Sequence, residues 1–164
     1  MRIHVLQAPE PLECLAEAVD ALGKQSAIAQ ALSHEITSAA LFETSDTEQR
    51  QKLLLALDDN GVAMGFLKTG IKHLFYMSPK GEYIEIDPIC VLDFYVDENW
   101  QRRGVGLQLF QHLLHQENIA PAQLAYDRPS PKLFAFLKKH AGLTDHFPQP
   151  NRFVVFDEYF QRRQ

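Results

Sequence analysis

Apolar and polar positions along the chain follow two periods, one typical of strands and the other typical of helices. Alternating or continuous apolar runs predict strands at 3–6, 52–57, 62–68, 71–77, 83–86, 89–96, 123–126 and 153–156. Apolar residues at helical spacing predict helices over 11–32, 36–42, 105–116 and 130–141. Turn residues separate these segments, among them Asn60-Gly61, which is typical of a hairpin.

The order of these elements predicts the fold class. Several antiparallel strands precede one strand–helix–strand unit formed by 89–96, 105–116 and 123–126. Such a unit makes a parallel pair of strands with a crossover helix. We therefore expect an α+β or α/β fold with a mostly antiparallel twisted sheet, one parallel pair and flanking helices. The 164 residues suit a single domain over 1–164.

Composition narrows the classes of function and location. The net charge of −5 argues against nucleic acid or an anionic membrane as a partner. The sequence contains no apolar run of membrane-spanning length and no secretory core near the N-terminus, so we expect a cytosolic protein. Its two cysteines, Cys14 and Cys90, predict reduced thiols, and the seven histidines form no pattern of metal ligands.

A glycine-bearing turn joins the apolar strand 89–96 to the helix 105–116. It reads Gln101-Arg102-Arg103-Gly104-Val105-Gly106. Free backbone N–H groups at a helix start attract phosphates, and two arginines reinforce that attraction. Leu109 replaces the third glycine of a dinucleotide fingerprint, and no Gly-Lys-Ser/Thr follows, so neither nucleotide motif is present. By itself the turn is also compatible with a purely structural role.

Four polar or reactive residues lie where an apolar core is expected. Gln30 falls on nearly the same helical face as Val19, so it points into a cleft unless the helix bends after Gly23. Packing rules place Cys90 in the core as an inert thiol. Asp127 follows a strand and is either a base or the partner of a cap or ion pair. Asp93 interrupts the buried strand, and we interpret it as structural.

The turn resembles the pyrophosphate loop of the GCN5-related acetyltransferase superfamily. Five further segments resemble the α-tubulin N-acetyltransferase family within it: LGKQSAIAQALS at 22–33, ITSA at 36–39, GFLKTGIK at 65–72, ICVLDFY at 89–95 and DRPS at 127–130. The resemblance covers nearly the whole chain. It implies a modified version of the superfamily fold and direct transfer of acetyl from acetyl-CoA to a lysine on the luminal loop of α-tubulin.

The resemblance also assigns residues and partners. It makes Asp127, Cys90 and Gln30 catalytic, with Gln30 orienting the substrate. Acetyl-CoA, without a metal, would contact Phe94, Tyr95, Val96, Gln101, Arg102, Arg103, Gly104, Val105, Gly106, Leu107, Ser130, Lys132 and Lys139. We expect a local basic patch of Lys68, Lys72 and Arg128 and an apolar wall at Phe153 on the substrate side. A monomer acting on microtubules of the cytoplasm or the ciliary axoneme, without nucleic acid or membrane, is expected.

Two alternative functions stay open, and the distance between Cys90 and Asp127 needs an explanation. The chain could acetylate another protein or a small amine, or be a noncatalytic module that binds CoA or microtubules. Cys90 lies six residues before Val96, about 20 Å along a strand, whereas Asp127 closes the neighbouring strand. If the strand ends were flush, the two residues would lie apart, so we expect staggered strands or a water between them.

Overall fold

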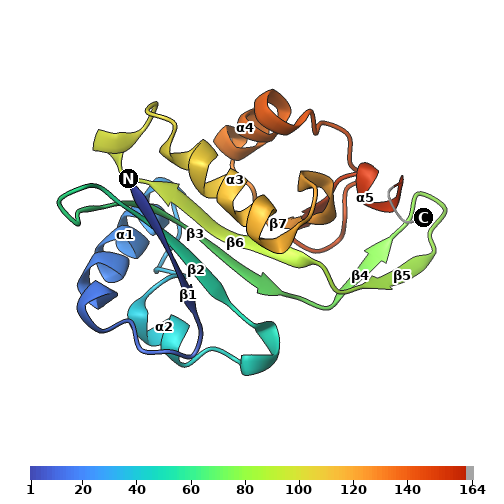
Figure 1. Ribbon diagram of the computed structural model, residues 1–164. Coiled ribbons are helices and arrows are strands. Elements are labelled where there is room, and N and C mark those ends of the chain that lie inside the picture. Colours follow the sequence, from blue (N-terminus) through green and yellow to red (C-terminus); the bar gives the residue numbers. More distant parts are fainter. Residues whose placement is uncertain (162–164) are drawn as a thin grey trace.

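A computed structural model describes residues 1–161 and shows a six-stranded sheet in the order β1-β2-β3-β6-β7-β8 (Figure 1). Its strands are β1 (Arg2–Gln7), β2 (Lys52–Leu57), β3 (Ala63–Ile71), β6 (Ile89–Val96), β7 (Ala125–Asp127) and β8 (Phe153–Val155). Every neighbouring pair is antiparallel except β6 and β7, which are parallel. The predicted fold class, including its one parallel pair, is confirmed.

Helices cover both faces of this sheet (Figure 1). α1 (Ala16–Ala29) and α2 (Ala39–Glu43) lie on one face, and α3 (Val105–Glu117) and α4 (Pro131–Ala141) lie on the other. An apolar cluster lies on each face of the sheet, because successive side chains of β2 point to opposite faces. Leu53 and Leu55 pack toward α1, whereas Leu54 and Ala56 pack toward α3. A short helix, α5 (Glu158–Gln161), lies near the end of the described chain. Among residues 1–161, no helix has the length and apolar character needed to cross a membrane.

β4 (Leu74–Met77) and β5 (Tyr83–Ile86) form a separate two-stranded sheet beyond the end of β3 (Figure 1). The predicted separation of strands 62–68 and 71–77 at residues 69–70 was wrong, because β3 runs through Gly70 to Ile71. A Cβ atom on Gly70 would lie 2.9 Å from Leu92 Cδ1, so this glycine permits close packing inside a strand rather than ending it.

Several helix boundaries also differ from those predicted. α1 begins at Ala16 instead of residue 11, after a 3₁₀ turn (Glu13–Leu15) in which Glu13 has φ of 55°. It ends at Ala29, since the cap residue Gln30 is no longer helical. α2 begins at Ala39 because the Ser38 hydroxyl accepts a hydrogen bond from the Leu41 amide and caps the helix there.

Further differences concern the C-terminal third and the short connecting turns. A 3₁₀ turn (Pro121–Gln123) delays the start of β7 to Ala125, so that Asp127 is the last residue of the strand rather than the first after it. α5 was not predicted, and residues 162–164 lie outside the described part of the chain. Two more 3₁₀ turns are Thr47–Gln49 and Glu98–Trp100.

A β-bulge interrupts the pairing of β3 with β6. Lys68 pairs with Asp93 and Thr69 pairs with Val91, so Leu92 has no partner on β3. Cys90 and Leu92 belong to the apolar cluster beneath β4 and β5, and the Asp93 side chain also lies on the face opposite α3. The bulge therefore sends two consecutive side chains, Leu92 and Asp93, to the same face of the sheet.

Candidate active site

A buried carboxylate connects the sheet to α1 just after the bulge. Asp93 Oδ1 accepts hydrogen bonds from Ser26 Oγ at 2.8 Å and from Gln30 Nε2 at 3.0 Å. Its Oδ2 accepts a third, from Thr37 Oγ1 at 2.6 Å. The Asp93 residue is only 4% exposed, and these three donors satisfy it. The structural interpretation of Asp93 is thus supported by its contacts.

Gln30 is half-buried and held in a defined position. Its Nε2 donates both to Asp93 and to Ser26 Oγ, the latter at 2.8 Å. Of the two arrangements that the sequence left open, the side chain directed into the protein is the one observed. Ser26 and Thr37 were missed by the sequence analysis, since a serine and a threonine in these positions carry no distinguishing signal.

Lys68 lies directly opposite Asp93 and is buried, with 6% of the residue exposed. Its ammonium donates to the Ile36 carbonyl oxygen. Burial is the main reason that the pKa of Lys68 falls from 10.5 to about 8, and the nearby Lys72 lowers the pKa further, while Asp93 and Asp127 oppose the decrease. A lysine so buried does not contribute to an exposed basic patch, which corrects the expectation for Lys68. Lys72 and Arg128, in contrast, are partly exposed.

The parallel register brings Cys90 and Asp127 close together. Cys90 pairs with Ala125 and Val91 pairs with Tyr126, so Asp127 lies beside Leu92 rather than at the level of Val96. Side chains two residues apart on a strand share a face, which places Asp127 on the same face as Ala125 and Cys90. The ends of β6 and β7 are therefore staggered. This explains how Cys90 and Asp127 can lie close together although flush strand ends would separate them.

Cys90 is a protonated thiol at physiological pH. The residue is fully buried, and its Sγ contacts the Pro88 carbonyl oxygen at 3.6 Å. Burial raises the pKa of Cys90 to about 12, and the nearby Asp127 carboxylate contributes to the increase. Because the thiolate is the nucleophilic form, this environment disfavours an acetyl-cysteine intermediate. The packing expectation for Cys90 is confirmed, and its catalytic role stays a prediction.

Asp127 is held by two arginines. Its Oδ1 accepts a hydrogen bond from Arg152 Nε at 2.7 Å, and Arg128 Nε lies 3.7 Å away. Only 7% of the Asp127 side chain is exposed. The sequence analysis anticipated the pair with Arg128 but missed Arg152, which reaches Asp127 because Phe153 pairs with Asp127 across β7 and β8. Phe153 itself is buried, and Arg152 lies over its ring at 5.3 Å.

The loop before α3 has the geometry of an anion site. Arg102 and Gly104 have φ angles of 67° and 81°, and Gly104 immediately precedes the first helical residue, Val105. The first N–H groups of α3 lack intrahelical acceptors and are free for a ligand. Arg102 and Arg103 are exposed beside them, and Arg103 stacks on Trp100 at 5.2 Å. Two arginine charges and several free backbone N–H groups thus lie together at the turn where the sequence predicted phosphate binding.

Within the described chain, the C-terminal part of β6, next to this loop, has one edge without a neighbouring strand. β7 ends at Asp127 and pairs only with Cys90 and Val91, so within residues 1–161 the segment from Phe94 to Val96 has a neighbouring strand only on the β3 side. Gln101 Nε2 donates to the Val96 carbonyl oxygen at 2.7 Å and joins the loop to that edge. An extended ligand with amide groups could lie along Phe94, Tyr95 and Val96.

The start of α4 offers a second set of backbone donors near the end of β7. Ser130 caps the helix by accepting from the Leu133 amide at 3.1 Å, and Pro131 occupies its first position. Lys132 is exposed in the first turn, whereas Lys139 lies seven residues later, about 10 Å farther along the helix. The two predicted lysines therefore do not lie together at the helix start.

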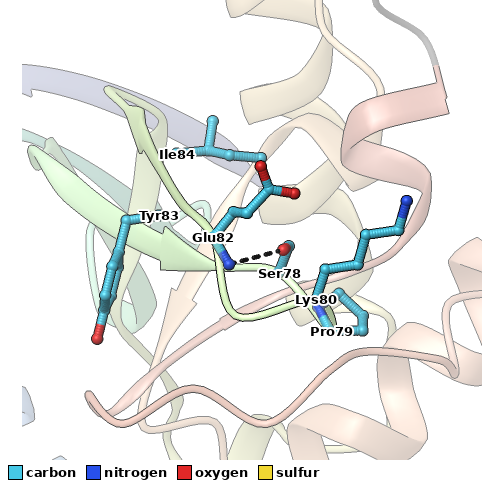
Figure 2. Close-up of a pocket in the computed structure, with 6 residues that line it drawn as sticks. All are labelled: Ser78, Pro79, Lys80, Glu82, Tyr83 and Ile84. Carbon is cyan, nitrogen blue, oxygen red and sulfur yellow. Dashed lines mark hydrogen bonds between the residues drawn. The ribbon is translucent and has the colours of Figure 1, made fainter.

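A shallow hollow of about 300 Å³ lies at the turn of the β4–β5 hairpin (Figure 2). It is lined by Ser78, Pro79, Lys80, Glu82, Tyr83 and Ile84. The Glu82 amide donates to Ser78 Oγ at 3.2 Å across the turn, and Figure 2 shows Tyr83 directed away from Lys80. None of the predicted site residues lines this hollow.

Comparison with known proteins identifies the family of this chain. A family model described as "GNAT acetyltransferase, Mec-17" matches residues 3–164. A protein of Phytophthora infestans named alpha-tubulin N-acetyltransferase is 70% identical over all of both chains. Alpha-tubulin N-acetyltransferase 1 of Danio rerio is 46% identical over 94% of this chain, which spans 52% of that longer protein.

Solved structures show the same fold at low sequence identity. The xEco2 acetyltransferase domain bound to a CoA conjugate has a TM-score of 0.62 and 11% identity, with 94% of this chain and 91% of that chain covered. A variant of the BH1408 protein of Bacillus halodurans has a TM-score of 0.63 and 14% identity, with coverage of 91% and 97%. The family match and the relatives together show that this chain belongs to the Mec-17 family of GNAT acetyltransferases.

Proposed function

We propose that this chain transfers the acetyl group of acetyl-CoA to a lysine side chain of α-tubulin, the luminal-loop lysine of microtubules. The substrate is inferred from the names of the similar proteins of Phytophthora infestans and Danio rerio. The structural observation that carries the proposal is the position of Asp127. Asp127 is the last residue of β7, and beyond it, among the described residues, β6 has a neighbouring strand only on the β3 side. The starts of α3 and α4, with their free backbone N–H groups, flank this unpaired part of β6.

The described residues fit acetyl-CoA. The loop from Gln101 to Leu107 would bind the pyrophosphate, because its backbone donors and two arginines are suited to an anion. The open edge from Phe94 to Val96 would pair with the amide groups of the pantetheine. Ser130 and Lys132 at the start of α4 would contact further phosphate oxygens. Lys139, in the last turn of the same helix, would make a more distant contact with the cofactor. Bound in this way, acetyl-CoA supplies an activated thioester.

In the proposed mechanism, Asp127 accepts the proton that the substrate ammonium must lose before its nitrogen can attack. Arg152 and Arg128 hold the Asp127 carboxylate in place from one side. The acetyl carbon forms a bond to the lysine nitrogen, the bond to sulfur breaks, and CoA leaves as a thiol after taking up a proton. The transfer is proposed to be direct, and the burial that raises the pKa of Cys90 to about 12 supports this by disfavouring the nucleophilic thiolate. Cys90 lines the same face as Asp127.

Lys72 and Arg128 are proposed to meet the acidic surface of tubulin, with Phe153 as an apolar wall beneath them. Gln30 is proposed to orient the incoming substrate. We infer that the protein works as a monomer on microtubules in the cytoplasm, including those of cilia.

Incubation with microtubules and labelled acetyl-CoA tests the proposal. We expect label on α-tubulin, and an Asp127→Asn variant should lose about 10²- to 10⁴-fold in kcat while still binding acetyl-CoA. A matched Asp145→Asn variant, which changes an exposed aspartate elsewhere, should keep the wild-type rate. Label on other proteins or small amines but not on tubulin would overturn the substrate assignment. CoA or microtubule binding without any transfer would indicate a noncatalytic module.

A further inference from the structure

We infer that Asp93, together with Ser26, is a positioning residue that fixes the Gln30 side-chain amide with its nitrogen toward the sheet and its carbonyl oxygen toward the substrate. This inference rests on the proposed function of the site. It gives Asp93 a role beyond the structural one, because the carboxylate determines which atom of Gln30 a substrate meets.

The hydrogen-bond donors and acceptors around Gln30 permit one orientation of its amide. The Ser26 hydroxyl donates to Asp93 Oδ1, so its oxygen is free to accept from Gln30 Nε2. One Gln30 N–H is shared between Ser26 Oγ and Asp93 Oδ1, because these two acceptors lie only 2.8 Å apart and on the same side of Nε2. A flipped amide would place the Gln30 oxygen against Asp93 Oδ1, a carboxylate oxygen that cannot donate, and would replace this hydrogen bond with a repulsion. The amide nitrogen must therefore face Asp93 and Ser26.

The Gln30 carbonyl oxygen is consequently the atom available for a ligand. Among residues 1–161 it has no hydrogen-bond partner, and the residue is half-buried rather than fully solvated. A lone carbonyl oxygen accepts from N–H groups and repels carboxylates. The matching ligand chemistry is an N–H donor of the substrate, either the lysine ammonium or the peptide backbone beside it.

The carboxylate that sets this orientation is itself held on several sides. Thr37 Oγ1 donates to Asp93 Oδ2, and the Lys68 ammonium lies opposite on β3 and bonds the Ile36 carbonyl oxygen. These contacts attach the segment between α1 and α2 to the same point of the sheet. Asp93 and the proposed base Asp127 both raise the pKa of Lys68, so the two carboxylates lie around the same buried ammonium.

Two single variants separate positioning from stability. Ser26→Ala and Thr37→Val each remove one hydrogen bond to Asp93, but only Ser26 also contacts Gln30. We expect both variants to lower the melting temperature by similar amounts. Ser26→Ala should reduce kcat/KM for tubulin by about tenfold, because it removes a direct contact to Gln30. Thr37→Val, which acts on Gln30 only through the far oxygen of Asp93, should have a clearly smaller effect, and the Kd for acetyl-CoA should be unchanged in both. Equal kinetic losses in both variants would overturn the positioning role.

An exchange of the two partners tests Asp93 directly. Gln30→Glu places two carboxylates together and should reduce kcat/KM by about 100-fold. Adding Asp93→Asn to Gln30→Glu restores a donor–acceptor pair, because the new amide at position 93 of the sheet can donate to the carboxylate at position 30. The other carboxylate oxygen at position 30 is then left toward the substrate. We expect the double variant to recover at least about tenfold over Gln30→Glu. Additive losses in the double variant would contradict the inference.

A measurement without activity distinguishes this inference from the proposed function. In NMR spectra of the wild-type protein, the Gln30 side-chain NH₂ protons should exchange slowly with solvent. They should exchange faster in Ser26→Ala but not in Thr37→Val. Slow exchange together with absence of tubulin labelling would overturn the proposed function alone, whereas fast exchange in the wild type would overturn the fixed amide.

Discussion

The carbonyl oxygen of Thr37 lies 1.8 Å from the position that a Cβ atom on Gly23 would occupy. The backbone that follows α1 therefore packs directly on the middle of that helix. This contact explains a glycine inside a helix, where alanine would otherwise be more favourable by about 1 kcal/mol. Gly23 is not the weak point of α1 that its helix propensity predicts.

A Gly23→Ala variant should consequently be less stable than the wild type. We expect a loss of about 1–3 kcal/mol in the free energy of unfolding, because the new methyl group overlaps backbone atoms that have little freedom to move. Urea unfolding followed by circular dichroism measures the loss. Ala21→Gly, at an exposed position of the same helix, should lose only about 1 kcal/mol through propensity. A gain in stability for Gly23→Ala would contradict the packing explanation.

The two glycines at the start of α3 should differ in their effects on cofactor binding. Gly104 has a φ of 81°, which costs a residue with a side chain about 1–2 kcal/mol, so Gly104→Ala should weaken acetyl-CoA binding by about tenfold. A Cβ atom on Gly106 would make ordinary contacts of 3.6 Å with Phe94 and Val96, so Gly106→Ala should leave the loop unstrained and weaken binding less than Gly104→Ala does. Isothermal titration calorimetry with acetyl-CoA compares the two. Wild-type affinity in both variants would argue against phosphate binding by this loop.

The buried lysine predicts a pH dependence of stability. Because the pKa of Lys68 is about 8 in the folded protein and 10.5 in the unfolded chain, the unfolded chain binds more protons between these values. The free energy of unfolding should therefore rise with pH in this range, by up to about 1.4 kcal/mol per unit. Below pH 8 the lysine is protonated in both states, and this slope vanishes.

A Lys68→Met variant isolates this contribution. The raised pKa values of Cys90 and the buried tyrosines act in the opposite direction at alkaline pH, but they are present in both proteins and cancel in the difference. In urea unfolding between pH 7 and pH 10, the free energy of unfolding of the wild type should rise relative to that of Lys68→Met above pH 8, by up to about 1.4 kcal/mol per pH unit. Parallel profiles would mean that Lys68 titrates normally.

The environment of Cys90 predicts an unreactive thiol. Its full burial and its pKa of about 12 should prevent alkylation by iodoacetamide at pH 8, whereas the exposed Cys14 should react. Intact-protein mass spectrometry should find one modification in the native wild type and two in urea. A Cys14→Ser variant should remain unmodified until it unfolds, and rapid native labelling of that variant would contradict the buried position.

Periodicity alone predicted the sheet, its parallel pair and the helices that flank it, because burial of one face governs local sequence. The separate β4–β5 sheet was not predictable, since nothing in a strand pattern states which sheet it joins. The proximity of Cys90 to Asp127 depends on the parallel register, which involves distant segments. Lys68 and Arg152 show the same limit, because a lysine pattern does not reveal burial and Arg152 meets Asp127 only through the pairing of β7 with β8.

The half-open edge of β6 has a consequence for the protein without its cofactor. An unpaired strand edge is a template for pairing with another chain and a common starting point for aggregation. If the pantetheine amides occupy the edge at Phe94 to Val96, acetyl-CoA acts as a protective cover as well as a reactant. Solubility and shelf life of the purified protein should then depend on cofactor concentration, and CoA should protect as well as acetyl-CoA.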